Sequence, residues 1–169
     1  MNKRQAVVAE LPRLRRYARA LLRDPVAADD LVQDCLERAL SRLSLFKAGT
    51  NMRSWLFTIM HNLHVNAVRR RHRAPDGEPL SPGVEDGVAV QPDQTTGLVA
   101  RDIARALDLL PDDQRHVVLL VGLEEMSYKN AAEILDIPMG TVMSRLARGR
   151  ERLRDLMEGD DPTVLRRVK

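Results

Sequence analysis

The sequence predicts an all-α protein in which two small helical domains, residues 1–73 and 98–169, are joined by a flexible linker, residues 74–97. Apolar residues recur at helical spacing on both sides of the linker, and no segment shows the period-two alternation of a strand. Within the linker, proline and glycine alternate and every charged residue is acidic. Such a segment cannot offset its ordering entropy by burial, which favours a flexible joint.

Length and composition limit the kind of protein this can be. The chain has 169 residues, 44% hydrophobic and 30% charged, enough for one ordinary domain or two very small ones with modest cores. The single cysteine, Cys35, excludes an intramolecular disulfide and favours a reducing cytosol; we expect it to be a small apolar packing residue. The longest apolar run, residues 117–121, is far too short for a bilayer span. We therefore expect a soluble, cytoplasmic protein without membrane insertion.

The first domain should begin with two helices, one over about 11–22 and one from Asp24-Pro25 to about Leu43. Asp is a favourable N-cap and Pro suits the first helical position. On a helical wheel, the apolar residues of the second helix share one face: Leu31, Val32, Cys35, Leu36, Ala39 and Leu43. The opposite face carries Asp30, Gln33, Asp34 and Glu37. Taken alone, that polar face is typical of the solvated side of an amphipathic helix.

A third helix is predicted over 52–73, and it carries two stripes. The core stripe is Met52, Leu56, Ile59, Met60, Leu63 and Ala67; a second stripe, about a right angle away, is Trp55, Thr58, Asn62, Asn66, Arg69 and Arg73. A stacking ring, amides and guanidinium groups suit unpaired bases and phosphates. Alternatively, Trp55 is a core residue and residues 69–73 are a solvated helix end whose cations favour the macrodipole. That both features share one face favours nucleic-acid binding.

The second domain should contain helices over about 98–109 and 114–123, the second of them a strongly apolar core helix. Ser127 then caps the first helix of a helix-turn-helix, and Asp136 occupies its left-handed C-terminal position. The last helix should run from Pro138-Met139 to about Leu156, with Val142, Leu146, Gly149 and Leu153 facing inward. Its outward ridge is Thr141, Ser144, Arg145, Arg148 and Arg152. Such a ridge suits a major groove, although it could also be a surface helix without a partner.

Three segments, in this order, resemble the extracytoplasmic-function (ECF) sigma factors of bacterial RNA polymerase. They are Asp29-Asp30-Leu31-Val32-Gln33-Asp34, then FKAGTNMRSWLFTIMHNLHVNAVRRR, and finally LPDDQRHVVLLV with a helix-turn-helix ending in GTVMSRLARGRERL. The resemblance covers roughly 11–73 and 110–156. Within the family, the GTNMRSWLFTI segment resembles the sigma factors of the alphaproteobacterial general stress response. Membership implies promoter-specific initiation with core RNA polymerase and regulation by an anti-sigma factor.

The resemblance also implies a role for each surface. The docking face for core polymerase would comprise Asp30, Gln33, Asp34 and Glu37. The melted minus-10 element would be captured by Phe46, Asn51, Trp55, Asn62, Asn66, Arg69 and Arg73. The duplex minus-35 element of the promoter would be read by Thr141, Ser144, Arg145, Arg148 and Arg152. The family's pattern often has an acid in place of Asn66, and a basic or small residue in place of His61 and His64.

Other functions fit the sequence less well. A stand-alone helix-turn-helix regulator leaves the acidic helix and the Trp55 stripe without a role. A sigma mimic that sequesters an anti-sigma factor should have lost the basic residues that this chain retains. We expect no enzyme, cofactor or metal, because the sequence has no phosphate-binding glycine loop and no activated nucleophile, and the pair His61 and His64 lacks a third ligand.

Overall fold

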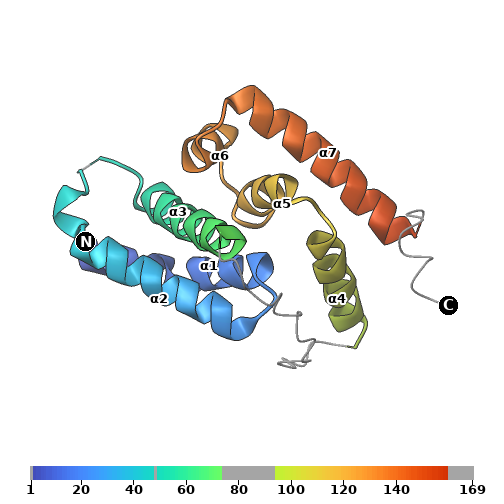
Figure 1. Cartoon of the computed structure of the whole chain (residues 1–169), viewed down its shortest axis with the longest axis horizontal. Helices are drawn as coiled ribbons and strands as arrows, with labels where there is room; N and C mark the ends of the chain where they lie inside the picture. The colour runs from blue at the N-terminus through green and yellow to red at the C-terminus, as the bar shows by residue number, and fades with distance from the viewer. Residues whose placement is uncertain (1, 48, 74–93, 160–169) are drawn as a thin grey trace. The chain divides into compact units, whose positions relative to one another are not determined.

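A computed structural model describes residues 2–47, 49–73 and 94–159 (Figure 1). Every regular element in these residues is helical, which confirms the predicted fold class. In chain order the elements are α1 (Lys3–Leu21), α2 (Pro25–Ser41), η1 (Leu43–Leu45), α3 (Met52–Arg73), α4 (Gln94–Asp108), α5 (Asp112–Val118), η2 (Leu119–Leu123), α6 (Tyr128–Leu135) and α7 (Met139–Glu158). One compact unit contains α1, α2 and α3, and another contains α4, α5 and α7.

Residues 74–93 of the predicted linker lie outside the described residues. Helix α4 begins at Gln94, slightly before the expected start near Leu98. None of the helices in the three described ranges is both long and apolar enough to cross a bilayer.

Helix α1 begins at Lys3 rather than near Leu11 because Asn2 caps it. The Asn2 side chain accepts a hydrogen bond from the Arg4 backbone N–H (3.3 Å), and the Asn2 N–H donates to Gln5 Oε1 (3.1 Å). Pro12 therefore lies inside the helix instead of at its start, at a typical cost of about 3 kcal/mol. Burial of Val7 before it and Leu14 after it offsets this cost.

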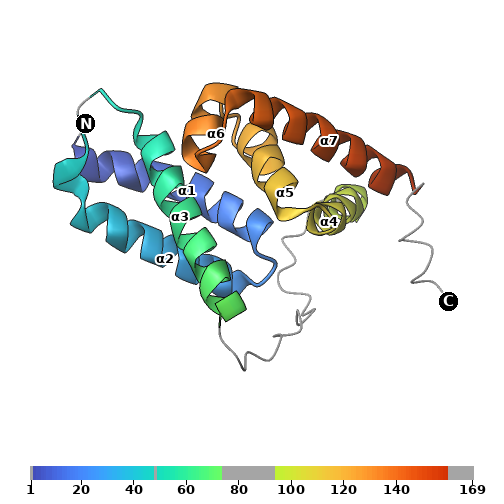
Figure 2. The same ribbon diagram turned by 45° about the horizontal axis from the view of Figure 1, so that its top comes forward.

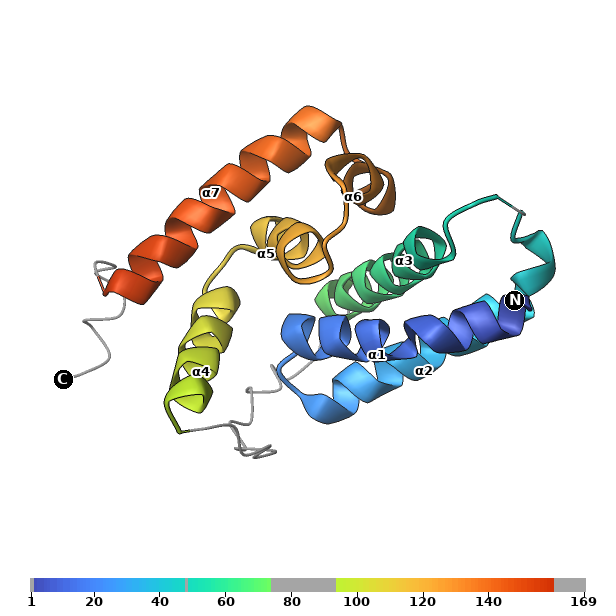
Figure 3. The same ribbon diagram turned by 180° about the vertical axis from the view of Figure 1, so that it is seen from behind.

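The core of the first unit lies between α1, α2 and α3, which pack side by side (Figures 1 and 3). The rings of Tyr17 and Phe57 meet edge to face, with centroids 5.1 Å apart. Of the apolar face predicted for α2, Leu31, Val32, Cys35 and Ala39 are buried and Leu36 is half-buried. Leu43, also half-buried, lies in η1, because α2 ends at Ser41 rather than near residue 43. Phe57, outside the predicted core stripe of α3, is also buried.

Cys35 is a packing residue, as predicted. Its thiol is buried and donates to the Leu56 carbonyl (3.5 Å), and burial raises the pKa of the thiol to about 12. At neutral pH it is therefore an uncharged apolar side chain of the core.

In the second unit, α5 packs along α7, and α4 packs on the C-terminal half of α7 (Figure 2). The apolar helix predicted over 114–123 consists of α5 followed by a π-helical turn, η2. Val117, Leu119 and Leu120 are buried in this segment, as its apolar character predicted.

The helix-turn-helix segment begins and turns where the sequence predicted. Ser127 Oγ accepts a hydrogen bond from the Asn130 N–H (3.1 Å), which caps α6. Asp136 follows α6 in the left-handed conformation, with φ of 52°. Helix α7 then begins at Met139, after Pro138. Of its predicted inward residues, Val142, Leu146 and Gly149 are buried and Leu153 is half-buried.

Candidate nucleic-acid interface

The polar face of α2 is exposed along its whole length. Its exposed residues include the four predicted docking residues, Asp30, Gln33, Asp34 and Glu37. Asp34 and Glu37 also line a groove of about 570 Å³ between α2 and α3, together with Arg38, Arg42 and Arg70. The predicted docking face is thus bordered by cations on one side. No pattern in the sequence indicates that these cations lie beside the acidic residues, because their proximity depends on how α2 and α3 pack.

The Trp55 indole lies on a preformed support. Its ring centroid is 5.2 Å from that of Phe46, with a 53° angle between the planes. Phe46 itself is buried. Lys3 Nζ donates to the Phe46 carbonyl (2.9 Å), and the same ammonium group lies 5.9 Å from the centroid of the Phe46 ring. Trp55 is half-buried, so part of its surface remains available for stacking. In this conformation Phe46 supports Trp55 rather than presenting its own face to a ligand.

The amide and cationic residues of the α3 stripe are exposed, and the backbone start of α3 is fixed. Exposed residues of this stripe are Asn62, Asn66, Arg69 and Arg73. The Asn51 side-chain oxygen accepts from the N–H groups of Arg53 (3.0 Å) and Ser54 (3.4 Å), and so caps the helix. Its oxygen is therefore already engaged, although the residue is exposed.

His61 lies on α3 between the core and the exposed stripe. Burial, and to a lesser extent the nearby His64, lowers the pKa of His61 from 6.5 to about 4. The imidazole is therefore uncharged at neutral pH. It therefore adds no positive charge to the α3 surface at neutral pH.

This pKa shift predicts a pH dependence of stability. The unfolded chain binds a proton at His61 below pH 6.5, whereas the folded chain binds it only near pH 4, so the free energy of unfolding should rise with pH across this window. In urea titrations between pH 4 and 6.5, His61→Gln should show a shallower rise than the wild type. His72→Gln, at the exposed end of α3, is the matched control. If the free energy of unfolding rose equally steeply with pH in His61→Gln and in the wild type, the lowered pKa of His61 would not be the cause of the rise.

On α7, the predicted ridge divides into exposed and engaged residues. Ser144, Arg148 and Arg152 are exposed, and Arg148 donates from Nε to the Ser144 carbonyl (3.3 Å) and from Nη2 to Ser144 Oγ (3.4 Å). Arg145 is only 28% exposed, because its Nε lies 3.3 Å from Asp113 Oδ2 at the start of α5. Thr141 is half-buried. The ridge is thus narrower than the sequence indicated, with Ser144 and Arg148 as its ordered centre.

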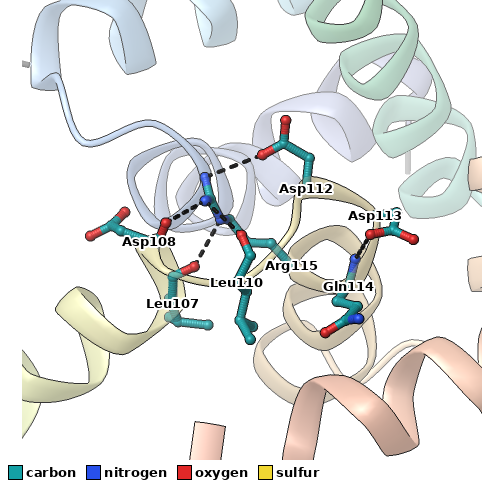
Figure 4. Close-up of polar contacts among 7 residues, drawn as sticks. All are labelled: Leu107, Asp108, Leu110, Asp112, Asp113, Gln114 and Arg115. Atoms are coloured by element: carbon teal, nitrogen blue, oxygen red, sulfur yellow. Dashed lines mark hydrogen bonds and ion pairs between the residues drawn. The ribbon is translucent and has the colours of Figure 1, made fainter. Parts of the chain in front are cut away.

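Arg115, which belongs to none of the predicted sites, connects α5 to the end of α4 in the second unit. The Arg115 guanidinium donates from Nε to the Leu107 carbonyl (2.9 Å) and from Nη2 to the carbonyls of Asp108 (2.8 Å) and Leu110 (3.1 Å) (Figure 4). Its Nη1 lies 3.7 Å from Asp112 Oδ1. Arg115 therefore caps the C-terminus of α4 from α5. No periodic pattern marks it in the sequence, because its partners are backbone carbonyls.

Together these features define a helical DNA-binding protein with an acidic surface on α2 and basic or stacking surfaces on α3 and α7. Two family models match the chain: the Sigma2 domain of PhyR over residues 7–61, and sigma-70 region 4 over residues 100–153. The ECF RNA polymerase sigma factor EcfG of Rhodopseudomonas palustris is 39% identical over 157 residues, 93% of this chain and 86% of EcfG. SigW of Bacillus subtilis, another ECF sigma factor, is 31% identical, covering 75% of this chain and 73% of SigW.

Among solved structures, the chain is similar to the sigma factor RpoE of Bartonella quintana, determined in complex with the anti-sigma factor NepR. The TM-score is 0.78 at 36% identity, covering 94% of this chain and 98% of RpoE. This protein belongs to the ECF RNA polymerase sigma factors. The matches to EcfG and RpoE agree with the subgroup that the GTNMRSWLFTI segment predicts.

Proposed function

We propose that this protein binds core RNA polymerase in the cytoplasm and directs it to promoters through two separate DNA contacts. The observation that carries the proposal is the segregation of exposed chemistry. Acids and an amide line α2, a supported indole with amides and guanidinium groups lines α3, and a serine and arginine ridge lines α7. A protein that bound only duplex DNA would need the last of these surfaces alone.

The proposed polymerase contact is the exposed face of α2, made by Asp30, Gln33, Asp34 and Glu37. Three of these residues are exposed carboxylates, so they suit a cationic partner surface, and the same face also exposes the apolar side chains of Val26 and Leu40. The buried opposite face fixes the helix against α1 and α3. The carboxylates are thus presented on a rigid element, as a docking surface requires.

The proposed minus-10 contact centres on Trp55. An indole held by Phe46 can stack on a base that has left the duplex, at a gain of roughly 1–3 kcal/mol per base. Asn62, Asn66, Arg69 and Arg73 continue the same stripe and suit the edges and phosphates of the unpaired strand. Asn51 acts in this proposal by positioning the start of α3, and Phe46 by supporting the indole.

The proposed minus-35 contact is α7, with Ser144 and Arg148 toward base edges and Arg152 toward phosphate. Arg145 and Thr141, which are less exposed, border this contact. The Asp113 carboxylate holds Arg145 at 3.3 Å, so Arg145 would contribute to DNA binding through its remaining donors.

We also propose regulation by an anti-sigma factor. The RpoE relative was solved with the anti-sigma factor NepR, and CnrH, 25% identical to this chain with a TM-score of 0.68, was solved with the cytosolic domain of CnrY. The groove between α2 and α3, lined by Asp34, Glu37, Arg38 and Arg70, offers both charge signs to such a partner. A partner bound there would cover part of the proposed polymerase contact.

A second candidate function is a sigma mimic that sequesters an anti-sigma factor. The match of residues 7–61 to the Sigma2 domain of PhyR favours it, because a solved PhyR is described as an anti-anti-sigma factor. Retained basic groups argue against it. Arg69 to Arg73 at the end of α3 and Arg148 and Arg152 on α7 are all exposed, and a mimic has no use for them.

Run-off transcription with purified bacterial core polymerase distinguishes these candidates. We expect transcripts from a defined set of promoter fragments of the source genome only when this protein is added. Binding to core polymerase without any initiation would support the mimic. A footprint on duplex DNA without core polymerase would instead support a stand-alone regulator.

Trp55→Ala should weaken holoenzyme binding to a single-stranded non-template minus-10 oligonucleotide by about 5- to 100-fold. The physical reason is the loss of base stacking, since the supporting Phe46 remains in place. Fluorescence anisotropy with labelled oligonucleotide measures this change. Trp55→Phe, which keeps an aromatic face, is the control and should lose less. Undiminished binding by Trp55→Ala would remove the indole from the proposed contact.

A further inference from the structure

The recognition helix α7 exposes apolar atoms beside its polar ridge. Met143 is 45% exposed, and Ala147, one turn later, is exposed as well. These two residues immediately precede Ser144 and Arg148, so the two pairs form parallel rows along the helix. Arg150 and Arg154 continue the exposed surface toward the C-terminus. A large thioether is thus placed on a surface that is otherwise cationic and hydrogen-bonding.

The position of Met143 distinguishes it from the other exposed methionines of α7. Met139, 49% exposed, lies four residues before Met143 on the same row, at the first residue of α7, and does not adjoin Ser144. Met157, 44% exposed, lies in the last turn, far from the helix N-terminus that enters a groove in helix-turn-helix proteins. Met143 alone combines exposure, the N-terminal half of α7 and direct adjacency to Ser144.

The major groove offers one apolar group to such a side chain. Among the base edges exposed there, only thymine carries a methyl group, at C5, and the other edge atoms are hydrogen-bond donors and acceptors. Met is unbranched and polarizable, so it can adapt to that methyl group, and the small side chain of Ala147 leaves space beside it. The surrounding arginines supply attraction to the flanking phosphates.

Building on the proposed minus-35 contact of α7, we propose that Met143 selects a thymine in the minus-35 element by contact with its 5-methyl group. Ser144 and Arg148 then read hydrogen-bonding groups of neighbouring bases. This makes Met143 a specificity-determining residue that the ridge predicted from the sequence does not include.

Deoxyuridine substitution tests the proposal, because it removes only the methyl group. Each thymine of the minus-35 element, on either strand, is replaced singly in a promoter selected with the wild-type protein. The affinity of holoenzyme assembled from core polymerase and the full chain is then measured by competition. One replacement should weaken wild-type binding by about fourfold, the loss expected for one buried methyl-sized group. With Met143→Ala, thymine and uracil at that position should bind equally well.

Met157→Ala is the matched control, since it removes an equally exposed methionine of the same helix and should keep the fourfold discrimination. The proposal is overturned if every deoxyuridine replacement is silent, if Met143→Ala retains the discrimination, or if the selected element contains no A·T pair. These outcomes are separate from a failure of the proposed function, in which the holoenzyme would not distinguish the promoter from unrelated DNA.

Discussion

Replacing Arg115 with methionine is expected to lower the stability of the second unit by about 2–4 kcal/mol. The guanidinium donates to three backbone carbonyls at the end of α4, at 2.8 to 3.1 Å, and its side chain is only 16% exposed. Hydrogen bonds from a charged donor contribute roughly 1.5–3 kcal/mol each, and the freed carbonyls would recover part of this loss from water. Methionine keeps most of the aliphatic stem, so the change isolates the polar contacts.

Hydrogen exchange in the full chain measures this effect segment by segment. Amides of α4 and α5 should exchange faster in Arg115→Met, while those of α1 to α3 report the undisturbed first unit. Arg105→Met is the matched control, because Arg105 forms an exposed i,i+3 pair with Asp102 (3.8 Å) that should contribute less than about 1 kcal/mol. Equal effects of the two substitutions would show that the carbonyl contacts of Arg115 add no stability.

The parts of the fold predicted correctly depend on local chemistry. The Asp24-Pro25 start of α2, the Ser127 cap of α6 and the left-handed Asp136 are each fixed by interactions within a few residues. The start of α1 was predicted wrongly. The helix extends back from about residue 11 to Lys3, because Asn2 caps it and the burial of Val7 and Leu14 offsets the cost of Pro12 inside the helix.

The candidate site likewise combines surfaces that the sequence predicts with contacts that it does not. Helical periodicity predicted which residues of α2, α3 and α7 share a face. It could not predict that Phe46 is buried beneath Trp55 or that Arg145 reaches Asp113, because each contact depends on which neighbour a loop or helix meets in three dimensions. The Asn51 cap is local, since its side chain accepts from the N–H groups of Arg53 and Ser54, and an asparagine just before a helix start could have indicated it. The sequence therefore indicated the surfaces, and the structure indicates which side chains on them are available to a partner.

Gly149→Val is expected to destabilise the second unit by about 2–4 kcal/mol and to weaken promoter binding through α7. A Cβ at Gly149 would lie 2.7 Å from Val118 Cγ2 and 3.5 Å from Gln114 Cβ, so α5 and α7 could no longer approach as closely. Val118 is buried and β-branched, and it has little freedom to turn away. The higher helix propensity of valine, worth a few tenths of a kcal/mol over glycine, offsets little of this cost.

The same substitution at Gly140, on the same helix, is the control. A Cβ added at Gly140 would meet no atom within 4 Å. Gly140→Val should change the stability of α7, measured by hydrogen exchange, by less than about 0.5 kcal/mol. If the clash with Val118 is the cause, Gly149→Val should cost about 1–2 kcal/mol less in a Val118→Ala background than in the wild type. An unchanged cost in that background would mean that Gly149 is required for a reason other than its packing against α5.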